Sequence, residues 1–144
     1  MNLENKELKA LTVILRASQA IHEVIRKDVA SYQLNATEFA VLELLYHKGD
    51  QPIQTVGKKI LIASSSITYV IDKLEKKQLV TRRDCPNDRR VTYASLTIKG
   101  NQLMNQIFPQ HQAIVKKIFG CIEEDELDKT IELMKRIGYQ AEKL

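Results

Sequence analysis

Short hydroxyl side chains and basic side chains recur at helical spacing in the middle of the chain. The set comprises Ser64, Ser65, Ser66, Thr68, Tyr69, Lys73 and Lys76. Serines at the start of a helix let a phosphate approach the free backbone N–H groups there. Tyr69 and Lys73 are long enough to reach base edges or a further phosphate. We therefore expect this helix to enter the major groove of duplex DNA, which is about 12 Å wide and admits one helix.

A second basic group follows, in a stretch rich in turn-forming residues. Residues 84–90 are polar and separate two β-rich segments, 79–83 and 91–96, which predicts a hairpin with a basic tip. The candidate DNA contacts in this hairpin are Arg83, Asp88, Arg89 and Arg90. An arginine at the tip can reach the minor groove, where narrow A·T tracts concentrate negative potential.

The distribution of charge agrees with an anionic partner. The net charge is +4, and residues 52–100 hold ten Lys/Arg against four Asp/Glu, whereas the other residues hold twelve against fourteen. Positive charge is thus concentrated in the middle third, as expected for a surface that faces nucleic acid. A solvated surface with a chance excess of basic residues explains the charge equally well.

Each candidate residue also has a purely structural explanation. Ser64 can be a helix cap, Tyr69 can pack against the hairpin, and the lysines and arginines can simply face solvent. The DNA interpretation is favoured because the serines, the lysines and the basic hairpin follow one another in the order that docking of a helix and a wing requires.

The residues before the serine run predict three helices. Residues 3–32 contain no Gly or Pro, and their apolar residues, near helical spacing, offer more surface than one small core needs. Asn35 and Glu38 form the pattern of a capping box for a second helix, which Gly49 ends. Pro52 suits the first turn of a short third helix.

The fourth helix starts at the serines, and its buried face is predicted from i, i+3, i+4, i+7 spacing to be Ile67, Val70, Ile71 and Leu74. After the hairpin, Thr97 caps a fifth helix to about residue 119, in which Pro109 predicts a kink or a local break. The acidic run 123–126 favours the start of a last helix. The predicted fold is mainly α with a small β-hairpin wing. We expect a winged helix-turn-helix DNA-binding domain over 34–97 and a helical dimerisation region over 1–33 and 98–144.

The sequence from Ser65 to Gly100 resembles the MarR family of bacterial transcriptional regulators. The resembling residues are Ser65-Ser66-Ile67-Thr68, Asp72-Lys73-Leu74-Glu75-Lys76-Lys77, Leu79-Val80, Arg83, Asp88-Arg89-Arg90-Val91 and Leu96-Thr97-Ile98-Lys99-Gly100. The resemblance implies a homodimer, held by the first and the last two helices, on a palindromic operator. It also implies that Asp88 orients Arg90 toward the minor groove, while Arg89 meets phosphate. Gln78 and Leu61 depart from the family, which commonly has Gly at both positions, and Gln78 must then adopt a left-handed or altered turn.

Within the family, residues 39–46 and 91–97 are similar to the MhqR-like branch, which responds to quinones and related phenolics. The similarity implies a repressor of detoxification genes that leaves DNA when an aromatic compound binds. The pocket would be lined by the first, second and fifth helices, with these candidate residues: Arg16, Ser18, His22, Phe39, Tyr46, Phe108 and His111. Aromatic residues on such helices are also ordinary core residues.

The two cysteines suggest an alternative means of release. Cys85 lies in the basic hairpin, where neighbouring arginines favour a thiolate, so a thiol-based redox-sensing regulator remains open. Cys121 is interpreted as structural. Neither cysteine belongs to a C-x-x-C pair and the histidines are scattered, so we expect no disulfide, no bound metal and no cofactor.

An enzyme is not expected, because the sequence has no glycine-rich phosphate loop, no nucleophile elbow and no cluster of carboxylates in an apolar setting. A winged helix that binds protein instead of DNA is the remaining rival. The sequence has no apolar run of the roughly 18 residues that a membrane helix needs, and its first nine residues do not resemble a signal peptide. A cytoplasmic location is therefore expected.

Overall fold

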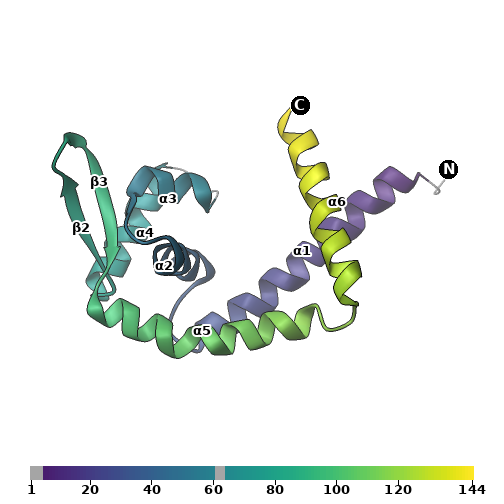
Figure 1. Cartoon of the computed structure of the whole chain (residues 1–144), viewed down its shortest axis with the longest axis horizontal. Coiled ribbons are helices and arrows are strands. Elements are labelled where there is room, and N and C mark those ends of the chain that lie inside the picture. Colours follow the sequence, from purple (N-terminus) through teal and green to yellow (C-terminus); the bar gives the residue numbers. More distant parts are fainter. Residues whose placement is uncertain (1–4, 61–63) are drawn as a thin grey trace. The chain divides into compact units, whose positions relative to one another are not determined.

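The computed structural model describes residues 5–60 and 64–144, with the backbone alone at 64 and 65. Its elements in chain order are α1 Lys6–Ala30, α2 Ala36–Lys48, β1 Gln51–Pro52, α3 Ile53–Lys59, α4 Ser64–Lys76, β2 Val80–Cys85, β3 Asp88–Leu96, α5 Ile98–Ile118 and α6 Glu124–Glu142. Figure 1 shows α2, α3 and α4 beside the β2–β3 hairpin, which is the wing. The predicted class, mainly helical with a small sheet, is confirmed.

The chain forms two compact units, Met1–His111 and Gln112–Leu144. The boundary falls within α5, which runs through Pro109 as one helix. Of the two predicted alternatives, the local break is therefore wrong, and the kink stays a prediction. A proline removes one helical hydrogen bond. Met104, Ile107 and His111 are buried on both sides of it, and their packing supports the helix there.

The core of the first unit is built from one face of each helix. The buried apolar residues include Val29 of α1, several residues of α2, the predicted face of α4, and two residues of α5: Phe39, Val41, Leu42, Leu45, Ile67, Val70, Ile71, Leu74, Met104 and Ile107. All four residues predicted to form the buried face of α4 are in this core. Because that face is buried, the opposite face of α4 is left for a partner.

The sheet is three-stranded and antiparallel, in the order β1-β3-β2. The sequence did not predict β1, in which Gln51 and Pro52 pair with Ala94 and Tyr93. Pro52 was expected inside the first turn of α3, but it is the N-cap, with an extended backbone at φ −57° and ψ 136°. Proline is compatible with either position, so its presence alone could not distinguish them.

The hairpin strands are longer than predicted. The stretch 84–90 was expected to be a turn, but the turn is confined to Pro86 and Asn87, and strand pairing continues to Cys85 opposite Asp88. Most side chains at this end of the hairpin are exposed. Alternation of apolar and polar residues indicates a strand only where one face is buried. The exposed ends of these two strands lack that alternation, so their polar residues were predicted to be a turn.

The second unit comprises the end of α5, a turn, and α6. The predicted acidic start of α6 is confirmed as a capping box, in which the Glu123 backbone N–H donates to Glu126 Oε1 at 2.9 Å. Over its whole length α6 has no buried residue. Its apolar residues Ile131, Met134 and Ile137 are all exposed. Among the residues that the structure describes, no helix has the length and hydropathy to cross a membrane.

Candidate nucleic-acid interface

The exposed face of α4 presents most of the predicted DNA contacts. Ser66, Tyr69 and Lys76 are exposed, and Tyr69 is 62% accessible although it is a large aromatic residue. The Lys73 ammonium group lies 5.3 Å from the centroid of the Tyr69 ring, so the two side chains stack on this face. A cation–π contact at an exposed site contributes about 0.5–1 kcal/mol. The exposure of Tyr69 favours contact with a partner over the alternative that this residue packs against the hairpin.

Three of the predicted positions are described less fully. Thr68 is exposed on the same face and its backbone carbonyl lies 3.5 Å from Arg82 Nη2. The helix does begin at Ser64, as the serine run predicted. The side chains of Ser64 and Ser65, and the departure at Leu61, lie outside the described part of the chain.

Arg82 joins the wing to α4, a role that was not predicted from the sequence. Its guanidinium lies 2.6 Å from Asp72 Oδ1 and also pairs with Glu75, both on α4. Arg82 comes from β2 and is largely buried between the two elements. Asp72 and Glu75, three positions apart on α4, indicate that a basic partner is needed. The sequence alone does not show that this partner is Arg82, because the position of β2 beside α4 is seen only in the structure. These ion pairs connect the wing directly to α4.

The free end of the wing carries a preoriented arginine. Asp88 accepts hydrogen bonds from Arg90 through Nε at 3.1 Å, Nη2 at 3.3 Å and the backbone N–H at 3.0 Å. The Arg90 side chain is nevertheless 90% exposed. A guanidinium that is already oriented loses less side-chain entropy when it binds. Asp88 therefore holds Arg90 in position without covering it.

The same contact lowers the pKa of Asp88. The largest cause is the hydrogen bond from the Arg90 side chain, followed by the one from its backbone N–H. A carboxyl with a depressed pKa in the folded protein favours folding above its unfolded pKa, and this contribution is lost as the pH falls through the folded value. The Asp88 carboxylate is thus ionised at neutral pH and can accept the hydrogen bonds from Arg90.

We expect an NMR titration of the Asp88 carboxyl to give a pKa below the ordinary aspartate value. In Arg90→Ala the pKa should rise part of the way back, because the side-chain donors are lost while the backbone N–H remains. Arg89→Ala should leave the titration unchanged. An Asp88 pKa that is the same in Arg90→Ala and in the wild type would show that the side chain does not hold the carboxylate in solution.

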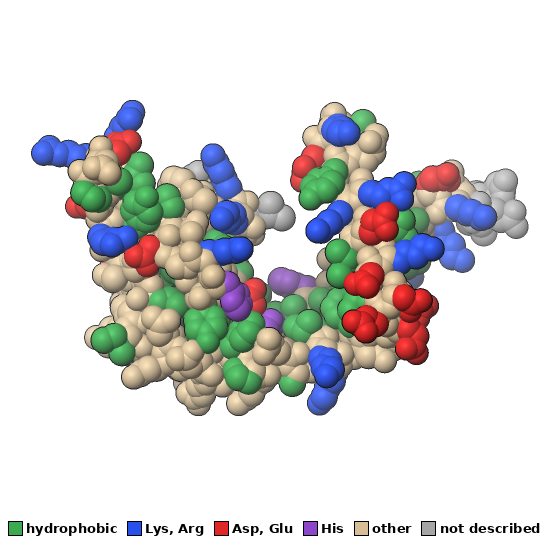
Figure 2. Space-filling view, viewed as in Figure 1, with side chains coloured by type: hydrophobic (Ala, Val, Ile, Leu, Met, Phe, Trp, Pro, Cys, Tyr) green, Lys and Arg blue, Asp and Glu red, His purple; other side chains and the backbone are tan. Residues whose placement is uncertain are grey.

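The other two arginines of the wing differ in their surroundings. Arg89 is exposed at the end of the hairpin. Arg83 lies further from the tip, where it pairs with Asp50 at 2.9 Å and lies 5.6 Å from the centroid of the Tyr93 ring. Figure 2 shows basic side chains projecting from the free end of the hairpin. The tip therefore offers the most accessible positive charge of the wing, while Arg83 is partly neutralised by Asp50.

Comparison with known proteins agrees with this geometry. Residues 34–92 match the model of the MarR family. The HTH-type transcriptional regulator MhqR of Bacillus subtilis is 50% identical over 139 residues, which are 96% of this chain and 96% of that protein. This chain belongs to the MarR family. The predicted resemblance, including the similarity to MhqR, is confirmed.

Solved MarR-family structures share the fold. AbsC of Streptomyces coelicolor superposes with a TM-score of 0.90 at 22% identity, covering 100% of this chain and 99% of that one. Sco3205 of the same organism, solved in complex with DNA, superposes with a TM-score of 0.89 at 20% identity, covering 96% and 93%. The chain is therefore a winged-helix, DNA-binding transcriptional regulator of the MarR family. Its relatives are regulators, which confirms the expectation that it is not an enzyme.

The effector residues predicted for this MarR-family chain separate into two groups. Phe39, Tyr46, Phe108 and His111 form an aromatic cluster, with ring centroids 4.6 Å apart for Phe39 and His111 and 5.6 Å apart for Tyr46 and Phe108. His47, which was not predicted, joins the cluster at 4.7 Å from Phe108. Phe39 is also a member of the hydrophobic core, which agrees with the alternative that aromatic residues on these helices are ordinary core residues.

Buried polar groups lie beside the aromatic cluster. His111 Nδ1 is 3.7 Å from Asp28 Oδ2 of α1, and His111 Nε2 is 3.4 Å from Glu43 Oε2 of α2. Neither carboxylate was predicted, because nothing in the sequence of α1 or α2 indicates that Asp28 and Glu43 converge on α5. A polar group within an aromatic cluster is a typical feature of a small-molecule site.

The other predicted effector residues, Arg16, Ser18 and His22, are exposed on α1. Cys85 is half-buried and Cys121 is exposed, and both are free thiols. Cys85 lies opposite Asp88 in the strand register. A change at its sulfur would therefore act next to the residue that orients Arg90, and a redox role for Cys85 stays a prediction.

Proposed function

We propose that the chain acts as a homodimeric repressor that binds a palindromic operator through α4 and the wing. The observation that carries this proposal is the exposed Arg90 guanidinium, which Asp88 orients beside the polar face of α4. A helix in the major groove and an arginine in the adjacent minor groove then read one half-site. Residues Ser64, Ser65, Ser66, Thr68, Tyr69, Lys73, Lys76, Arg83 and Arg89 supply the remaining contacts to bases and phosphates.

A homodimer is supported by the apolar surface that each unit leaves exposed. In α1, Leu8, Leu11 and Leu15 are 62%, 53% and 57% accessible. In α6, Ile131 and Ile137 are 48% and 50% accessible. Contiguous apolar surface of this kind marks an interface with another chain. A second copy of the chain is the natural occupant, because a two-fold dimer presents two recognition helices to the two halves of a palindrome.

Release by a small phenolic or quinone-type compound is supported by the similarity to MhqR and by the aromatic cluster on α2 and α5. Tyr46 and Phe108 are partly exposed members of this cluster, and the Tyr46 hydroxyl donates to Asn105 Oδ1 at 2.5 Å. An aromatic compound that inserts between these rings would have to differ in affinity for the DNA-bound and free forms in order to release the protein.

Fluorescence anisotropy with the operator, selected from a random duplex library, tests the proposed function. We expect tight binding that falls by about 10³–10⁵ between 50 and 200 mM salt for 6–10 phosphate contacts, because each phosphate contact releases counterions. Phenols and quinones added to the complex should then lower the anisotropy. Salt-independent binding would contradict the basic interface, and a complex that resists every compound of these classes would contradict the proposed effector alone.

A further inference from the structure

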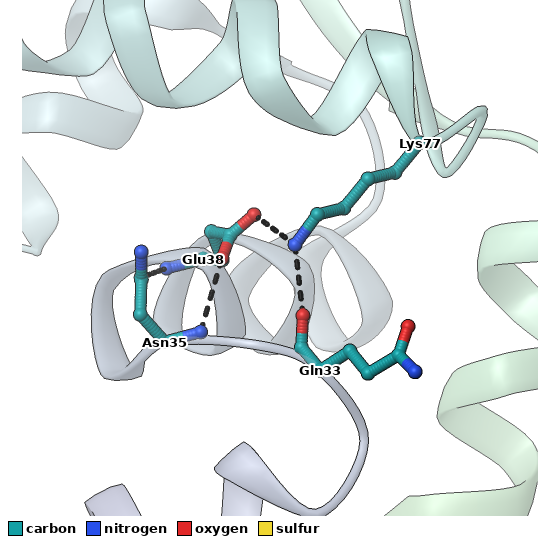
Figure 3. A network of polar contacts seen from close by, with 4 residues as sticks. All are labelled: Gln33, Asn35, Glu38 and Lys77. Carbon is teal, nitrogen blue, oxygen red and sulfur yellow. Dashed lines mark hydrogen bonds and ion pairs between the residues drawn. The ribbon is translucent and has the colours of Figure 1, made fainter.

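A buried carboxylate on α2 contacts two elements at once. Glu38 is 3% exposed at its side chain, and its Oε1 accepts a hydrogen bond from the Asn35 backbone N–H at 3.0 Å, which completes the capping box of α2. Its other oxygen, Oε2, forms an ion pair with Lys77 Nζ at 2.8 Å, as Figure 3 shows. One side chain thus caps α2 and binds the residue that follows α4.

Lys77 is directed away from the exposed face of α4. Besides its pairing with Glu38, its Nζ donates to the Gln33 backbone carbonyl at 2.8 Å, in the link between α1 and α2 (Figure 3). Gln33 has a positive φ of 63°. The ammonium group therefore satisfies both a buried carboxylate and a carbonyl of a strained link, and the α1–α2 junction is fixed to the end of α4.

The backbone at the end of α4 is also held by the start of α5. Lys99 Nζ donates to the Lys77 carbonyl at 3.2 Å, and the Thr97 hydroxyl donates to the Gln78 carbonyl at 2.7 Å. Gln78 has a φ of 63°, the left-handed turn expected from the sequence. A Cβ on Gly100 would lie 2.2 Å from the Leu79 carbonyl oxygen, so α5 approaches this turn as closely as glycine allows. The end of α4 is thus tied both to the α1–α2 junction and to the start of α5.

We infer that Glu38 and Lys77 are positioning residues for DNA recognition: they set the orientation of α4 without contacting DNA. The ion pair, which is buried at Glu38 and part-exposed at Lys77, fixes the C-terminal end of α4. The exposed residues of this helix must meet base edges within hydrogen-bond distance. The Glu38 carboxylate is buried, so removing Lys77 leaves it uncompensated, which is costly. When Glu38 is neutralised instead, Lys77, which is already 37% exposed, is released to solvent and no longer holds the end of α4. Base contacts require accurate geometry, whereas attraction to phosphates does not. The pair therefore governs specificity more than overall affinity.

This inference rests on the proposed role of α4 as the recognition helix, and Glu38→Gln tests it. Glutamine keeps the acceptor for Asn35 but removes the charge that faces Lys77. The loss of the carboxylate makes the net charge of the variant one unit more positive, so electrostatics alone would strengthen its binding to any DNA. We expect operator affinity to fall about tenfold, similar to the loss of one matched base pair, while affinity for random duplex stays the same or rises. Glu7→Gln, an exposed position in the first turn of α1 with the same change in charge, is the matched control.

Lys77→Met is an independent variant, and it carries the test if Glu38→Gln does not fold at the assay temperature. Its control is Lys48→Met, at an exposed lysine at the end of α2. We expect the ratio of operator affinity to random-DNA affinity to fall by a similar factor. The slope of the logarithm of the binding constant against the logarithm of the salt concentration should stay unchanged. A direct phosphate contact would instead weaken binding to all sequences and reduce the slope by about one for each lysine lost, which is about two for the dimer. In the double variant Glu38→Gln/Lys77→Met, the loss should be smaller than the product of the single losses, because the two residues act as one pair.

Two outcomes would overturn the inference: unchanged specificity in folded Glu38→Gln or Lys77→Met, or a salt slope reduced in Lys77→Met as for a phosphate contact. Arg90→Ala, measured in parallel, separates this failure from failure of the proposed function. If Arg90→Ala loses operator binding while the Glu38 and Lys77 variants match their controls, the positioning role is wrong and the DNA interface stands. If Arg90→Ala also binds as the wild type does, the proposed interface itself is wrong.

Discussion

Arg90→Ala should cause the largest loss of operator affinity of any single change in the wing. An arginine that reads bases is worth about 1–3 kcal/mol, and a dimer has two wings, so we expect a loss of roughly a hundredfold or more. The structure supports a large effect because Asp88 already orients the guanidinium while leaving it 90% exposed. Anisotropy titrations with operator and with random duplex at one salt concentration would measure it.

Arg89→Ala is the matched control for this prediction, since it removes the same charge from the neighbouring exposed position. If Arg89 meets phosphate, its loss should weaken binding to operator and random DNA by similar factors. Asp88→Asn should reproduce part of the Arg90→Ala effect, because a neutral amide holds the guanidinium less firmly. Equal losses for Arg89→Ala and Arg90→Ala on every sequence would contradict a base-reading role for Arg90.

Leu11→Lys combined with Leu15→Lys should convert the proposed dimer into monomers. Both leucines are more than half exposed on α1, and a lysine at each position would be desolvated in an apolar interface. Joining two half-site binders increases affinity by about 10²–10⁴, so a monomer should lose a factor in this range on the palindrome. Analytical ultracentrifugation would give the oligomeric state, and anisotropy would give the affinity.

The control adds the same charges to α1 at Ala17 and Ala20, which are exposed alanines. By helical spacing they lie on the side of α1 away from Leu11 and Leu15. Ala17→Lys/Ala20→Lys should remain a dimer and bind the operator at least as tightly as the wild type. A monomeric wild type, or a dimer that survives the leucine changes, would contradict the proposed role of α1.

Features set by neighbouring residues could be predicted from the sequence. The capping box of Asn35 and Glu38 and the buried face of α4 depend on residues within a few positions of one another. The left-handed turn at Gln78 was expected from the resemblance to the family, which commonly has Gly at this position. The Asp88–Arg90 contact is also local, although its role came from resemblance to the family.

Features that join distant segments could not be predicted. The ion pairs of Arg82 with α4 and of Lys77 with Glu38 cross the chain, and so does the pairing of β1 with β3. Many charged residues could be paired with one another on composition alone, and only the packing of α2, α4 and the sheet selects these partners. The same holds for Asp28 and Glu43, which meet His111 from two different helices.

The separation of the two faces of α4 also bears on how the regulator can evolve. Ile67, Val70, Ile71 and Leu74 hold the helix in the core, whereas Ser66, Tyr69 and Lys73 lie on the side that DNA would meet. Substitutions on the exposed side leave packing intact, and surface changes of this kind usually alter stability by less than about 0.5 kcal/mol. After gene duplication, a copy of this chain can therefore acquire a different operator through a few exposed substitutions while keeping its fold.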